Sequence, residues 1–241
     1  MKKDAEKHIN HINLIKVDGG KLPDCSELGP LEVEDFFIGC SSVTLHEWER
    51  VINWSRSNGY DINYSGENRP NNFPIAEATW RESVKWCNAL SELEGLVPVY
   101  TVENTILRFG ETNPHINHSA NGYRLPFEKE WEFAARGGTK SNNYEFSGSN
   151  DIDAVAWYNL NSDLRVHEVA QKNPNELGIY DMSGNVWEWC YDNSFNNVFR
   201  VIRGGAWHSD KTKCRVSYRG HLTGVPEFIF NGFRVVRGFI D

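Results

Sequence analysis

The chain has 241 residues, of which 39% are hydrophobic and 24% are charged, so it is long enough to bury a full core. Its formal net charge of −8 gives no general attraction to nucleic acid or to an anionic membrane surface. No apolar run reaches the length of a transmembrane helix, and residues 1–8 lack the hydrophobic segment of a secretory signal. We therefore expect no nucleic-acid partner and no transmembrane segment. The location is unknown: cytoplasmic if the sequence is complete, and cell surface or periplasm if a signal has been removed.

Residues 1–11 are charged and unpatterned, which predicts a flexible N-terminal tail ahead of one domain over residues 12–241. The stretch 31–39 begins with apolar and acidic residues in alternation, as a half-buried strand does. No internal repeat, low-complexity tract or long linker marks a second domain.

The sequence predicts three helices. Thr44 and Glu47 have the spacing of a capping box, so we expect a helix over about 45–57. A third helix begins near Pro126 and ends at Gly137 and Gly138. Between them, a helix over about 80–93 carries side chains for the core at spacings of three and four, namely Trp80, Val84, Cys87, Leu90 and Leu93.

Beyond Gly138 the pattern changes to short aromatic segments separated by Asn, Ser, Asp and Gly, and we expect no helix there. Helices followed by short strands and loops make an α+β domain with short strands, two or three helices and much ordered loop.

The third helix is unusually rich in charge. Its mixed charges predict a solvated face or structural ion pairs with no catalytic role. The residues concerned are Arg124, Glu128, Glu130, Glu132 and Arg136.

The five cysteines occur singly, without a Cys-x-x-Cys pair that would indicate zinc or a redox dithiol. They are Cys25, Cys40, Cys87, Cys190 and Cys214. Cys87 and Cys190 each follow a tryptophan and are interpreted as small buried apolar residues. The histidines show no helical pair that would bind a transition metal.

The segment 175–189 combines turn formers, a carboxylate and two tryptophans. Its glycines allow a tightly shaped loop, in which Asn185 and Glu188 offer oxygen atoms to a hard cation such as calcium. Two interpretations stay open. Either a structural calcium ion binds here, or Asn185 closes a turn and Glu188 pairs with an arginine.

Several ordered blocks together resemble the formylglycine-generating enzyme (sulfatase-modifying factor) family. The blocks are 123–138, 175–189, 200–207 and 232–236. The resemblance covers nearly the whole chain and implies a C-type-lectin-like fold. It also implies calcium at the 175–189 turn, with Val186 adding a main-chain oxygen to the side chains of Asn185 and Glu188.

The resemblance further implies where catalysis would lie. Enzymes of this family bind copper(I) through two cysteines in the region matching residues 203–219 and oxidise a substrate cysteine to formylglycine. This chain has only Cys214 in that interval. One alignment places Ser209 opposite the first cysteine and Cys214 opposite the second, and another leaves both catalytic positions without a match. A hydroxyl is a poor ligand for copper(I), so we expect neither copper nor formylglycine-generating activity.

Loss of the chemistry would leave a rigid scaffold whose polar loops bind a protein or carbohydrate ligand. Some proteins of this type are variable proteins diversified by retroelements, and their varied positions precede a Gly-Phe-Arg motif such as residues 232–234. We predict an exposed binding surface at Trp207, His208, Ser209, Asp210, Thr212, Ser217, His221 and Thr223. The alternative is a copper-dependent oxidoreductase that matures sulfatases and uses Cys214 and Ser209.

Overall fold

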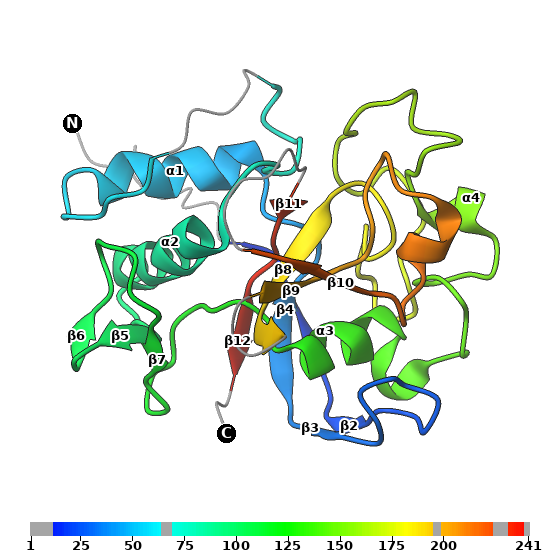
Figure 1. Cartoon of the computed structure of the whole chain (residues 1–241), viewed down its shortest axis with the longest axis horizontal. Helices are drawn as coiled ribbons and strands as arrows, with labels where there is room; N and C mark the ends of the chain where they lie inside the picture. The colour runs from blue at the N-terminus through cyan, green and yellow to red at the C-terminus, as the bar shows by residue number, and fades with distance from the viewer. Residues whose placement is uncertain (1–11, 64–68, 195–198, 224–230, 239–241) are drawn as a thin grey trace, which may run out of the picture.

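The computed structural model describes residues 12–63, 69–194, 199–223 and 231–238. The predicted tail over residues 1–11 lies outside these ranges. In Figure 1, α1 and α2 lie side by side to the left of a central sheet, whereas long loops form the right side of the molecule. Helices and short strands are thus combined in an α+β architecture.

The three longer helices confirm the prediction with small changes at their ends. They are α1 (Leu45–Ser55), α2 (Trp80–Leu93) and α3 (Glu128–Ala135). Thr44 caps α1, because its side chain accepts a hydrogen bond from Glu47 N while the Glu47 carboxylate accepts one from Thr44 N. Thr79 and Glu82 form the same reciprocal cap on α2. These satisfied caps fix where the two helices begin.

The expectation of no helix after Gly138 is wrong. The structure has a short helix, α4 (Ile152–Val155), and two single turns of 3₁₀ helix, η1 (Gly138–Lys140) and η2 (Lys211–Cys214). Asp151 and Asp210 cap α4 and η2, since each side chain accepts a backbone N–H two residues further on. Such single turns are too short to show an apolar period in the sequence.

The strands form four small sheets. One has the order β1-β4-β12 and another the order β10-β9-β8-β11, and the remaining two are β2-β3 and β6-β5-β7. The first two use β1 (Leu14–Val17), β4 (Phe36–Gly39), β12 (Val236–Gly238), β10 (Arg219–Leu222), β9 (Phe199–Arg203), β8 (Trp187–Ser194) and β11 (Asn231–Gly232). The others use β2 (Gly20–Lys21), β3 (Glu32–Val33), β6 (Thr105–Ile106), β5 (Tyr100–Val102) and β7 (His115–Ile116). β4 and β12 are antiparallel, so the last described strand pairs with one of the first.

The predicted strand over 31–39 is divided into β3 and β4. Asp35 lies in the break, where its carboxylate accepts a hydrogen bond from Gly19 N at 2.8 Å. The alternation of buried and exposed side chains holds within β4, since Phe36 and Ile38 are buried and Phe37 is exposed. The chain therefore changes sheets at a polar residue.

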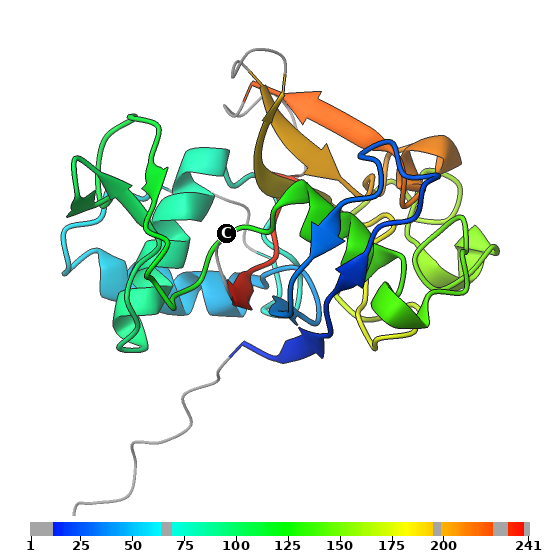
Figure 2. The ribbon, with the colours of Figure 1, turned by 90° about the horizontal axis from the view of Figure 1, so that it is seen from below.

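The sequence left two alternatives for the charged residues around α3. The structural ion pairs are confirmed, and the solvated face is wrong. Glu128, Glu130 and Glu132 are all buried. Each meets an arginine: Arg124 binds Glu130 with both terminal nitrogens at 2.6 Å, Arg203 binds Glu132 at 2.5 Å and Arg219 binds Glu128 at 2.7 Å. Figure 2 shows α3 between the N-terminal strands and the sheet formed by β8, β9 and β10. These pairs thus join α3 to neighbouring segments on several sides.

Candidate functional site

The segment after β9 forms a tight loop around Cys214. Gly205 has a φ of +76°, and a Cβ atom there would lie 2.8 Å from Cys214 Sγ. A glycine is therefore required on both counts. Cys214 itself is fully buried against an apolar cluster that includes Phe146, Ile152 and Tyr158. The loop holds this thiol in the interior.

Burial raises the pKa of the Cys214 thiol to about 12, and the nearby charge of Asp210 adds to the increase. The thiol is therefore protonated at neutral pH. Since the thiolate is the nucleophile and the metal ligand, Cys214 has little reactivity in this conformation.

Ser209, the residue that one alignment places opposite a catalytic cysteine, is also buried. Its Oγ accepts a hydrogen bond from Ala206 N at 3.0 Å, and its own N–H donates to Ala206 O at 2.8 Å. The prediction of Ser209 as an exposed ligand-binding residue is wrong, because these bonds turn its hydroxyl into the loop.

The other predicted ligand-binding residues are exposed or partly exposed, but they form two groups. Trp207, His208, Asp210 and Thr212 lie around η2, and Ser217, His221 and Thr223 lie along or beside β10. Figure 1 shows η2 next to α4 at the right, whereas β10 runs back toward the middle of the molecule. The η2 group is the more compact, and the aromatic rings of Trp207 and His208 meet edge to face at 5.0 Å.

All five cysteines are free thiols. Cys87 and Cys190 are buried, as the sequence indicated, and burial raises the pKa of both. Cys40 is partly buried and its pKa is also raised by burial, while Cys25 is exposed. The segment that would carry the copper site therefore holds one buried thiol.

The 175–189 turn is closed by Asn185, which has a φ of +62°. Its side chain accepts a hydrogen bond from His167 N at 3.0 Å and donates one to His167 O at 3.1 Å. Its backbone N–H donates to Trp157 O, and its carbonyl accepts the N–H of Trp207. Asn185 thus connects three loops, and this role matches the turn-closing interpretation.

Glu188 is buried and surrounded by donors. Arg234 binds it with Nε on Oε2 and Nη2 on Oε1, both at 2.7 Å. Ser42 Oγ donates to Oε1 at 2.6 Å, and Trp131 Nε1 donates to Oε2 at 2.7 Å. Four donors on two oxygens use the four lone-pair positions of a carboxylate. The predicted pairing with an arginine is therefore present.

This arrangement does not fit calcium binding through Asn185, Val186 and Glu188. The side-chain oxygen of Asn185 already accepts a hydrogen bond, and Glu188 has no lone pair left for a cation. Among the residues that the structure describes, no group of three or more His, Cys, Asp or Glu side chains is placed to hold a metal ion. Calcium at this turn is therefore an untested expectation from the sequence, and the bonds of Glu188 argue against it.

Sequence reasoning missed Asp181, a buried carboxylate four residues before Asn185. Burial raises its pKa to about 6, opposed by a hydrogen bond from Ala170 N. The run of turn residues around it gave no signal that its side chain points inward.

Calcium should leave the melting temperature of chelator-treated protein unchanged, because Glu188 is saturated by protein donors. Differential scanning calorimetry with calcium, and with magnesium as the control ion, measures this. The matched variant is Asn185→Gly, since glycine accepts the positive φ and removes the side-chain oxygen. A saturable, calcium-specific rise that this variant loses would contradict the bonding argument.

The sequence matches the sulfatase-modifying factor enzyme 1-like domain family over residues 10–239. It is 36% identical to the chaperone protein LppX of Paenibacillus barcinonensis, in an alignment covering 93% of this chain and 89% of that protein. The formylglycine-generating enzyme of Thermomonospora curvata is 31% identical, over 46% of this chain and 38% of the enzyme. The similarity to a catalytic relative is thus partial.

Two solved structures have the same fold over nearly their full length. CarF superposes with a TM-score of 0.84 and 28% identity, covering 97% of this chain and 100% of that chain. Treponema denticola variable protein 1 superposes with a TM-score of 0.77 and 28% identity, covering 93% and 94%. The described part of the chain contains no helix long and apolar enough to cross a membrane. The protein is therefore a member of the sulfatase-modifying factor enzyme 1-like family, with a single C-type-lectin-like α+β domain of short strands and few helices.

Proposed function

We propose that the protein is a non-catalytic binding protein that uses the family scaffold to present its C-terminal loops to a ligand. The observation that carries this proposal is the state of Cys214. It is the single thiol between residues 203 and 219, it is buried, and its pKa is raised to about 12. Copper(I) chemistry needs accessible thiolates, so this segment is poorly suited to oxidation of a cysteine.

The ligand that we favour is a protein. LppX, which is similar over nearly the whole chain, is named a chaperone, and the partner of a chaperone is another protein. The similarity to a variable protein supports the same kind of role, with side chains presented on a fixed frame. A carbohydrate ligand remains the alternative partner.

The surface proposed for binding is the loop around η2. His208, Asp210 and Thr212 are exposed there, and Trp207 lies partly exposed beside them. The loop is held on its buried side by Ser209, by Cys214 and by the hydrogen bond from Trp207 N to Asn185 O. Exposed polar side chains on a firmly held loop suit recognition, because little order is lost on binding.

The copper-dependent oxidoreductase that converts a protein cysteine to formylglycine is the alternative function. Copper(I) titration of the reduced protein against a chromogenic chelator separates the two. We expect Cys214→Ala to bind as little copper as the wild type, because the thiol is buried and protonated. Cys25→Ala serves as the control for uptake by an exposed thiol. Tight one-to-one binding that disappears only in Cys214→Ala would contradict the proposal and revive the enzyme.

Substitutions should distinguish the exposed residues of the η2 loop from the buried residues that hold the loop in place. Thr212→Ala removes an exposed hydroxyl and should change the free energy of unfolding by less than about 0.5 kcal/mol. Ser209→Ala removes a buried acceptor and leaves Ala206 N–H unpaired, at a cost of about 1–3 kcal/mol. Urea denaturation of both variants measures this, and equal losses would show that the loop is not divided in this way.

A further inference from the structure

The outer face of the β1-β4-β12 sheet carries an exposed aromatic residue. Phe37 lies in the middle strand, with 44% of its surface accessible. It is directly opposite Lys16 on β1 and Arg237 on β12, and paired residues of antiparallel strands project from the same face. An apolar ring at the centre of a sheet face, flanked by two cations, calls for an explanation beyond packing.

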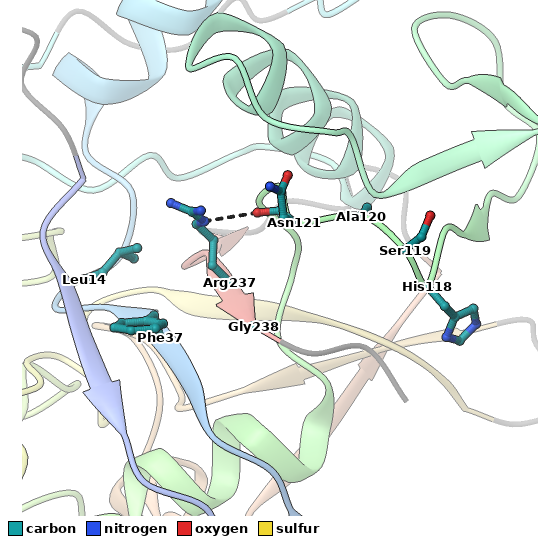
Figure 3. A pocket seen from close by; sticks show the side chains of 8 residues that line it. All are labelled: Leu14, Phe37, His118, Ser119, Ala120, Asn121, Arg237 and Gly238. Atoms are coloured by element: carbon teal, nitrogen blue, oxygen red, sulfur yellow. Dashed lines mark hydrogen bonds between the residues drawn. The ribbon is translucent and has the colours of Figure 1, made fainter.

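A cavity of about 720 Å³ opens at this face. Leu14, Phe37 and Ala120 give it apolar walls, and the loop 118–121 and Arg237 supply polar atoms. Figure 3 shows Arg237 between Leu14 and Asn121, with the Phe37 ring beside it. The volume and the lining are those of a small-molecule site, in which apolar walls are combined with a few polar groups.

The two cations differ in their partners. Lys16 is neutralised by Asp18 at 2.5 Å and by Asp35 at 3.3 Å. Arg237 has no carboxylate partner among the described residues. Its Nε donates to Asn121 O at 3.2 Å, and its guanidinium lies 5.2 Å from the centre of the Tyr123 ring. The Tyr123 hydroxyl also hydrogen-bonds to the Arg237 side chain. These described partners are neutral, so the positive charge of Arg237 is left for an anion.

We propose that this cavity binds a small amphipathic carboxylate, with its hydrocarbon part against Leu14, Phe37 and Ala120 and its carboxylate on Arg237. A guanidinium offers a planar pair of N–H groups that matches the two oxygens of a carboxylate. The apolar walls of the cavity shield the hydrocarbon part of the ligand from water. The site shares no residue with the η2 loop and stands or falls independently of the function proposed above.

The test is isothermal titration of the full-length protein with decanoate below its micelle concentration. Saturable one-to-one binding is expected, and octanoate should bind roughly tenfold more weakly because it lacks two methylene groups. Two compounds serve as controls. Acetate has the carboxylate of decanoate without its hydrocarbon chain, and decyltrimethylammonium has a hydrocarbon chain of the same length with a positive charge. Neither should bind.

Two variants assign the contacts. Arg237→Gln should weaken decanoate binding by about tenfold through loss of a charge-assisted bond, and Phe37→Ser should weaken it through loss of an apolar wall. Arg215→Gln is the matched control, because Arg215 is an exposed arginine paired with Glu145. Melting temperatures would verify that all three variants are folded.

Several results would overturn the proposal. Absence of saturable decanoate binding, equal binding of the cationic amphiphile, or unchanged affinity in Arg237→Gln each contradicts it. Residues 239–241 follow Gly238 directly and lie outside the described residues. Binding seen only after truncation at Gly238 would show that the chain's own end takes the place of the ligand, and this too would contradict a site in the intact protein.

Discussion

The contact on which the fold depends most is the buried pair of Glu188 and Arg234. Arg234 binds both carboxylate oxygens, and it also donates to Gly39 O and Tyr180 O at 2.9 Å. Glu188 in turn accepts from Ser42 and Trp131. This ion pair and its hydrogen bonds thus join β8, α3, the end of β4, the 175–189 turn and the segment 231–238. Removing either partner would leave a buried charge without compensation, at a cost of about 3–5 kcal/mol.

The same solution recurs around α3, where three buried glutamates meet Arg124, Arg203 and Arg219. Short strands and loops form few regular backbone hydrogen bonds. Specific side-chain ion pairs therefore hold the segments in place relative to one another. The frame that results supports the η2 loop from inside. It buries Ser209 and Cys214 while His208, Asp210 and Thr212 stay exposed, as the proposed binding role requires.

Local signals in the sequence were sufficient for part of this structure. The capping box at Thr44 and the apolar period of α2 predict the first two helices, because these signals depend on neighbours along the chain. The cap at Thr79 was recognised only in the structure. The burial of Glu128 and Glu132 could not be predicted, since Arg219 and Arg203, which bind them in the interior, lie far away in the sequence. The local pair of Glu132 with Arg136 does not by itself distinguish a buried carboxylate from an exposed one. The same limit applies to Ser209 and Asp181, whose polar side chains point inward in loops without periodicity. The pairing of Glu188 with an arginine was only one of two alternatives until Arg234 was located.

The most direct measurement is a double-mutant cycle on Glu188 and Arg234, by urea unfolding in calcium-free buffer. Glu188→Gln, Arg234→Gln and the double variant would be compared with the wild type. If the Glu188–Arg234 pair holds the fold together, each single variant loses several kcal/mol in its free energy of unfolding. The double variant then loses little more, which gives a large coupling energy. Additive losses, or coupling that arises only when calcium is added, would contradict the account.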